Sequence, residues 1–173
     1  MHRKTALRLS LIALLLLTGL FTDRLAHPAG PEAAILPAAK APDGFVLVAE
    51  AVDGDTVMLA DGSRVRYIGV DTPETVHPSK PVQCFGKEAS AYNKSLVQGK
   101  PVRLVRDVSE TDKYGRLLRY VYLEDGTLVN LALVQGGYAK VVTYPPDVAH
   151  AAEFQSAMAA ARAAGRGLWG ACR

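Results

Sequence analysis

Three acidic residues lie where two strand-like runs meet, and their types suit metal and proton chemistry. Asp55 lies in "VDGDTV", whereas Asp71 and Glu74 lie in "VDTPE", directly after the run "RVRYIGV". If the two runs form a hairpin, Asp55 and Asp71 meet at one end of the sheet, where two carboxylates repel each other unless a cation lies between them. Hard oxygen ligands favour Ca²⁺ or Mg²⁺. The pattern predicts a metal site with Glu74 beside it as a base, although each stretch alone is also typical of a turn.

Basic side chains near these acids suit a phosphate. Arg66 in "RVRYIGV" carries a planar guanidinium, which matches phosphate oxygens. In "TDKYGR", Lys113 and Arg116 add positive charge, and Tyr114 offers a ring for a base or sugar. Alone, these stretches are equally typical of a solvated strand face and a polar turn. Together with the acids they indicate phosphodiester hydrolysis.

The elements that must position these residues follow from the hydrophobic pattern. Alternating apolar residues predict five strands, at 45–52, 55–60, 63–70, 101–107 and 116–124. Helical spacing predicts helices at 85–98, within 127–137, and from an N-cap at Asp147 to Gly165. This order fits an α+β fold, a five-stranded OB-type Greek-key β-barrel with three α-helices. A generic α+β domain is the alternative.

The N-terminal part of the chain is set apart from this domain. Residues 1–26 join a basic start to the apolar run "LSLIALLLLTGLF", which predicts a signal peptide or an uncleaved N-terminal anchor. The run is short for a membrane span, which needs about 20 apolar residues. Residues 27–43 form an Ala/Pro-rich linker, and 44–173 form the folded domain. We therefore expect a secreted or extracytoplasmic protein, with membrane anchoring if the first segment is retained.

Charge and cysteine content limit the partners and the compartment. The net charge of +3 comes entirely from residues 1–41, because residues 42–173 carry 15 basic and 15 acidic side chains. Affinity for a polyanion must therefore come from local clustering, as between Lys100 and Arg119, or from a bound cation. Cys84 and Cys172 are the only cysteines. In an exported chain they permit one disulfide, with two unlinked thiols as the alternative.

Several segments in series resemble the staphylococcal nuclease (thermonuclease) family. They are "DGDTV", "VRYIGVDTPE", "EASAYNKSLV", "TDKYGRLLRYVY", "LVNLALVQGGYAKV" and "GLW", and they cover about residues 45–170 in order. The resemblance implies an OB barrel with three helices and a secreted, Ca²⁺-dependent nuclease. Such an enzyme cleaves DNA and RNA, leaves 3′-phosphate ends, and acts as a monomer without a stable protein partner.

The resemblance also implies a role for each matching residue. Asp55 and Asp71 match the calcium carboxylates, and Thr72 matches the residue whose backbone carbonyl also binds calcium. Glu74 matches the general base. Arg66 and Arg116 match the two catalytic arginines that hold the phosphate and its developing charge, and Lys113 and Tyr114 match substrate-binding positions near the nucleotide's other phosphate.

One stretch departs from the family pattern. The family often carries a tyrosine-rich stretch after "AKV", but here "VTYPPD" is one residue shorter, which leaves Thr143 or Tyr144 for the pocket. Pro145-Pro146 is a candidate for a cis bond. A non-catalytic OB-fold nucleic-acid-binding module is the alternative function. Loss of Glu74 or of an arginine would favour it, and none is lost. A module that binds protein or cell-wall polymer would need an exposed aromatic or acidic patch, and aromatic residues make up only 7% of the chain.

Overall fold

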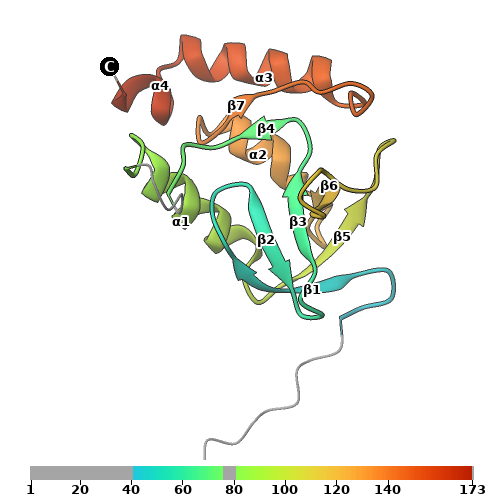
Figure 1. Ribbon diagram of the computed structural model, residues 1–173. Helices are drawn as coiled ribbons and strands as arrows, with labels where there is room; N and C mark the ends of the chain where they lie inside the picture. Colours follow the sequence, from blue (N-terminus) through green and yellow to red (C-terminus); the bar gives the residue numbers. More distant parts are fainter. Residues whose placement is uncertain (1–40, 76–80, 173) are drawn as a thin grey trace, which may run out of the picture. The chain divides into compact units, whose positions relative to one another are not determined.

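Five strands close into a barrel in the computed structural model, which describes residues 41–75 and 81–172 (Figure 1). They are β1 (Val46–Ala51), β2 (Thr56–Leu59), β3 (Arg64–Tyr67), β5 (Pro101–Val105) and β6 (Leu117–Tyr122). The strand order is β1-β2-β3-β6-β5, and β5 pairs with β1 to complete the closure. Strands β3 and β6 are parallel, whereas the other pairs are antiparallel. The predicted five-stranded OB-type barrel is confirmed.

The predicted strand at 63–70 is two strands. The chain turns at Ile68 and Gly69, and β4 (Val70–Asp71) leaves the barrel to pair with β7 (Lys140–Val141). In this small second sheet, Asp71 lies opposite Lys140. The expectation of one continuous strand at 63–70 was therefore wrong, and Arg66 and Asp71 approach each other from different sheets.

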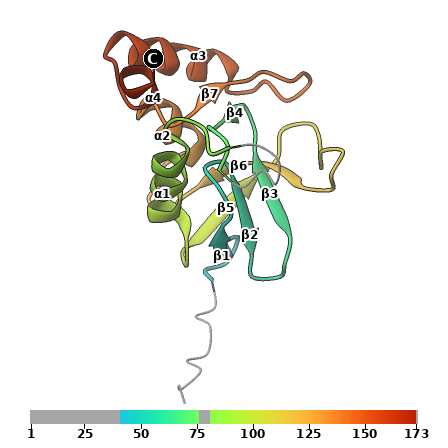
Figure 2. The same cartoon turned by 60° about the vertical axis from the view of Figure 1, so that its left-hand side comes forward.

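Four helices accompany the barrel: α1 (Gly86–Val97), α2 (Val129–Gln135), α3 (Ala151–Ala163) and the one-turn α4 (Leu168–Ala171). The first three correspond to the predicted helices, and α4 was not predicted. Figures 1 and 2 show α3 and α4 beyond the β4–β7 pair at one end of the barrel, with α1 along its side. These elements support the end of the barrel at which β3 runs into β4.

The N-cap predicted for the third helix was wrong. Helix α3 begins after His150, with no side-chain cap. Asp147 accepts hydrogen bonds from the backbone N–H groups of Val108 and Ser109 instead, at 3.0 and 2.8 Å. Its carboxylate therefore joins the loop before α3 to the loop after β5.

Fully buried valines from the barrel strands form the centre of the core, among them Val48, Val57, Val65, Val102 and Val121. Burying each such side chain contributes about 1.5–3 kcal/mol. Beside them, the buried Tyr67 hydroxyl donates to Asn93 Oδ1 at 2.9 Å, and Asn93 Nδ2 donates to the carbonyl of Asp53 at 2.8 Å. The core thereby fixes the loop that leads into β2.

A disulfide joins Cys84, just before α1, to Cys172, just after α4, with the two Cα atoms 5.9 Å apart. The predicted signal or anchor at 1–26 and most of the linker at 27–43 lie outside the described residues. Among residues 41–75 and 81–172, no helix is long and apolar enough to cross a membrane.

Candidate active site

The loop before β2 carries a buried carboxylate that is packed against the segment after β4. Asp55 is 4% exposed, and its Oδ2 accepts both the backbone N–H (2.8 Å) and the hydroxyl (3.1 Å) of Thr72. The neighbouring Gly54 makes this contact sterically feasible, because a Cβ atom there would lie 2.5 Å from the Thr72 hydroxyl oxygen. The two segments that the sequence predicted to converge do converge.

The carboxylates of Asp55 and Asp71 both ionise less readily here than they would in water. Burial raises the pKa of Asp55 to about 6, since it outweighs the attraction of Arg66, and the charge of Asp53 adds to the rise. The pKa of Asp71 is also raised, by burial and then by the charge of Asp55. Two such neighbouring acids have the electrostatics of a cation site.

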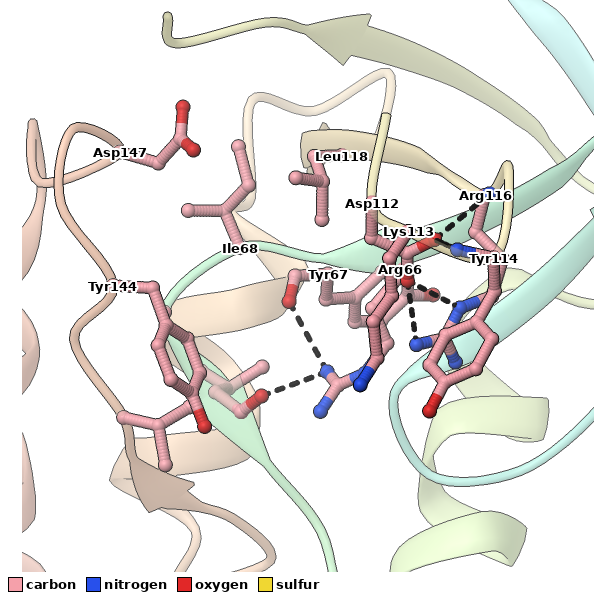
Figure 3. A pocket seen from close by; sticks show the side chains of 13 residues that line it. Arg66, Tyr67, Ile68, Asp112, Lys113, Tyr114, Arg116, Leu118, Tyr144 and Asp147 are labelled. Atoms are coloured by element: carbon pink, nitrogen blue, oxygen red, sulfur yellow. Dashed lines mark hydrogen bonds and ion pairs between the residues drawn. The ribbon is translucent and has the colours of Figure 1, made fainter. Parts of the chain in front are cut away.

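Arg66 lies between the two acids. Its Nη2 atom is 3.2 Å from Asp55 Oδ2 and 3.0 Å from Asp71 Oδ1. Its Nη1 atom donates to the backbone carbonyls of Tyr67 and Val70, at 3.1 and 2.7 Å (Figure 3). Both Nη atoms of Arg66 therefore have acceptors within the protein, and the backbone turn between β3 and β4 holds the guanidinium beside the two acids.

Glu74 lies on the irregular segment that follows β4. Its Oε1 accepts the backbone N–H of Thr75 at 2.9 Å. Glu74 lines a cavity of about 200 Å³ together with the two acids, Thr72 and both arginines; the full lining is Asp53, Asp55, Arg66, Asp71, Thr72, Pro73, Glu74 and Arg116. One cavity thus contains every residue that the sequence assigned to metal binding or catalysis.

Arg116 reaches this cavity from the loop before β6, where Asp112 orients it. The Asp112 Oδ2 atom accepts from Arg116 Nε at 2.8 Å and lies 2.7 Å from Nη2, and Oδ1 accepts the backbone N–H groups of Tyr114 and Arg116. Burial of Asp112 raises its pKa, but these hydrogen bonds outweigh burial, so the pKa is lowered overall. Asp112 therefore stays ionised and holds the guanidinium in place.

A larger cavity of about 500 Å³ adjoins the first, because Arg66 and Arg116 line both. Tyr114 and Tyr144 lie on opposite sides of it, with Arg66 between them (Figure 3). The two rings are 72% and 73% exposed, and Lys113 Nζ lies 5.0 Å from the centre of the Tyr114 ring. Flat exposed rings beside cations suit a nucleotide base and its phosphate.

Of the two residues left open for this pocket, Tyr144 lines it and Thr143 does not. The Pro145-Pro146 bond that follows is cis.

Sequence reasoning missed three residues that contact the site. Asp53 lines the smaller cavity, and its Oδ1 accepts the backbone N–H of Asp55 at 3.0 Å; the repeated acid in "DGD" was its signal. Asp112 precedes "KYGR" in a turn pattern, which signals a loop-forming role. Gln83, which contacts the backbone of Glu74, carries no local signal.

The donor set decides which metal the site fits. No cluster of three or more His, Cys, Asp or Glu side chains in residues 41–75 and 81–172 is arranged to hold a metal ion. The carboxylates that line the cavity are those of Asp53, Asp55, Asp71 and Glu74, and Thr72 lines it as well. Such an all-oxygen set, completed by water, fits a hard divalent cation such as Ca²⁺ and lacks the soft ligands that zinc or copper prefers.

The chain is similar to known nucleases over most of the region that builds these cavities. Residues 64–171 match the family model described as "Staphylococcal nuclease homologue". A thermonuclease of Staphylococcus intermedius is 48% identical over 104 residues (58% of this chain and 61% of that protein), and one of Staphylococcus hyicus is 39% identical over 125 residues (70% and 73%). Endonuclease YncB of Bacillus subtilis (strain 168) is 42% identical over 115 residues, 64% of this chain and 54% of that protein.

The chain thus spans less than two thirds of the first and third of these relatives and more than two thirds of the second. The family model covers more than half of this chain, from the start of β3 to the end of α4. On this match and on its barrel, the chain belongs to the staphylococcal nuclease family.

Proposed function

We propose that this protein is a calcium-dependent nuclease that hydrolyses phosphodiester bonds in DNA and RNA and leaves 3′-phosphate ends. One observation carries the proposal: a single cavity contains two acids suited to a metal, a third acid suited to a base, and two oriented guanidinium groups. The names of the relatives, thermonuclease and endonuclease, support the same reaction class.

In this proposal Asp55, Asp71 and the backbone carbonyl of Thr72 hold Ca²⁺. When bound, the cation offsets the negative charge of the phosphate and increases the acidity of nearby water. The raised pKa values of both acids are consistent with a site that binds a cation in place of protons.

The side chains of the cavity carry out the remaining steps. Glu74 accepts the proton of the attacking water, whose oxygen bonds to phosphorus while the bond to the 5′ oxygen breaks. The 5′ oxygen takes up a proton from solvent water and leaves as a hydroxyl group. Arg66 and Arg116 donate hydrogen bonds to the phosphate oxygens as negative charge builds up on them. Lys113 and Tyr114 bind the neighbouring part of the nucleotide. The phosphate then stays on the 3′ side of the break.

We also propose that the protein works outside the cytoplasm, either secreted or anchored through residues 1–26, as a monomer without a stable protein partner. The signal-like composition of that segment supports export. The disulfide between Cys84 and Cys172 adds support, because such bonds persist mainly in oxidising compartments.

The test is hydrolysis of single-stranded DNA and of RNA by the full chain, in Ca²⁺ and in excess chelator. We expect cleavage only with Ca²⁺. Glu74→Gln should reduce kcat by about 100-fold or more, as expected for loss of a general base. Glu124→Gln, which changes an exposed acid in the turn after β6, should leave the rate unchanged. Product ends that a polymerase extends only after phosphatase treatment would identify 3′-phosphates.

Cleavage that persists in chelator would overturn the metal assignment. Tight binding of DNA without cleavage under any divalent ion would overturn the enzyme and leave a nucleic-acid-binding module.

A further inference from the structure

The backbone of Glu74 is held by a residue nine positions later in the chain. The N–H of Gln83 donates to the carbonyl of Glu74 at 2.9 Å, and the N–H of Glu74 donates to Gln83 Oε1 at 3.0 Å. Both backbone polar groups of Glu74 are therefore bonded to the same residue. Glu74 lies outside any helix or strand, so these bonds substitute for the ladder that would otherwise fix its backbone.

The residues after Gln83 continue this contact. Gly86 N–H donates to the carbonyl of Gln83 at 3.0 Å. A Cβ atom on Gly86 would lie 3.0 Å from the Glu74 carbonyl oxygen and 2.8 Å from Thr75 Cγ2, so the start of α1 packs directly on this segment. We call residues Gln83–Gly86 the Glu74 clamp.

The Glu74 clamp is itself attached to two other parts of the fold. Cys84 is bonded to Cys172 at the end of α4. The ring of Phe85 stacks on Tyr138, with the ring centres 5.5 Å apart. The position of Gln83 is therefore set by the C-terminal helix and by the chain before β7, in addition to α1.

We propose that Gln83 is a positioning residue for Glu74, and that the Cys84–Cys172 disulfide keeps it in place. The inference rests on the proposed role of Glu74 as the general base. A base must lie within hydrogen-bonding reach of the water it activates, and displacement by about 1 Å can reduce a rate by roughly 100-fold. In residues 41–75 and 81–172, the side chain of Gln83 hydrogen-bonds to the backbone of Glu74, so its proposed effect passes through Glu74.

The first experiment is Gln83→Met in the full chain, assayed on single-stranded DNA with saturating Ca²⁺. Methionine has a similar length but no strong acceptor. We expect kcat to fall about tenfold while KM and the calcium Kd stay within twofold. Because Gln83 is exposed, the melting temperature should change little. The matched control is Gln98→Met: Gln98 Oε1 also accepts a backbone N–H, that of Ala51 at 3.3 Å, but in the barrel. The Gln98→Met variant should leave kcat unchanged.

A double-mutant cycle distinguishes positioning from a general structural effect. If Gln83 acts through Glu74, Gln83→Met should cause no further loss in a Glu74→Gln background. A tenfold loss in both backgrounds, or a Gln83→Met enzyme with wild-type kcat, would overturn the inference. If Glu74→Gln itself retains full activity, the proposed base is wrong, which is a separate failure of the proposed function.

The disulfide is tested by replacing Cys84 and Cys172 together with serine, after circular dichroism has verified the fold. We expect a fall in kcat that does not add to that of Gln83→Met, because both changes release the same segment. Fully additive losses would overturn the role of the disulfide. If the serine variant does not fold, the Gln83→Met cycle decides the role of Gln83 alone.

Discussion

The carboxylate of Asp112 is bonded to both the backbone and the guanidinium of Arg116, with the shortest ion-pair distance at 2.7 Å. The guanidinium that we propose to contact the phosphate is thereby oriented before any substrate arrives. Pre-oriented donors stabilise a developing charge without reorganising during the reaction.

Replacing this partner should therefore impair catalysis more than binding. We expect Asp112→Asn to lower kcat about tenfold or more, since a hydrogen bond to a charged group contributes about 1.5–3 kcal/mol. Steady-state kinetics on single-stranded DNA measures the change. Glu110→Gln is the control: Glu110 lies on the same loop but pairs with Arg106 and Arg119. An equal loss in both variants would mean that the loop, and not the orientation of Arg116, is responsible.

Asp147 should make stability depend on acid pH. Burial raises its pKa, but hydrogen bonds from Ser109 and Val108 outweigh burial and lower the pKa below the ordinary value of 3.8. A lowered pKa in the folded state gives stability that is present above pH 3.8 and lost as pH falls through the lower, folded value. Asp147→Asn should thus lower the free energy of unfolding at pH 7 by about 1–3 kcal/mol. The deficit should shrink towards pH 2 in urea titrations; a deficit that is constant with pH would contradict this origin.

Tyr144 should contribute to substrate affinity through its ring. It is 73% exposed on the wall of the larger cavity, opposite Tyr114. Stacking of a base on an aromatic side chain is worth about 1–3 kcal/mol, so Tyr144→Ala should raise KM roughly tenfold with little change in kcat. Tyr144→Phe keeps the ring and should retain the wild-type KM. If both variants bind DNA like the wild type, the ring does not stack on the substrate.

Gly54 should be required for the proposed metal site because no side chain fits between it and Thr72. A Cβ atom there would collide with the side chain of Thr72, so Gly54→Ala should push the Asp55 loop away from Thr72. We expect a loss of about 1–3 kcal/mol in stability, as for other overpacked sites, together with weaker calcium binding by calorimetry. Gly126→Ala is the comparison: its φ of +87° makes alanine costly, but open space surrounds it in the turn after β6. That variant should lose stability and keep its calcium affinity.

The barrel could be predicted because its signals are local. The strands alternate, the Asp61-Gly62 turn closes the β2–β3 hairpin, and α1 ends just before Gly99. The break between β3 and β4 could not be predicted, since the apolar pattern continues through Ile68 to Val70. Its cause is pairing with β7, which lies about 70 residues further along the chain.

In the candidate site, too, the residues with local signals could be predicted, whereas contacts between distant segments could not. Asp55, Asp71 and Glu74 could be found from their types and their place beside predicted strands. Asp147 was predicted as a helix cap, but backbone donors 39 and 38 residues earlier in the chain bind its carboxylate. The contact of Gln83 with Glu74 likewise depends on how two irregular segments pack, which no periodic pattern encodes.

The Cys84–Cys172 bond turns residues 84–172 into a covalent ring. Arg116 belongs to that ring, whereas Glu74 and the two acids proposed to bind the metal precede it. A protease that cuts once at the exposed Tyr144 would therefore produce two peptides that remain a single molecule until the bond is reduced. Such a nicked protein would migrate as one band on a non-reducing gel and as two after reduction, with both halves of the active site still tethered to each other.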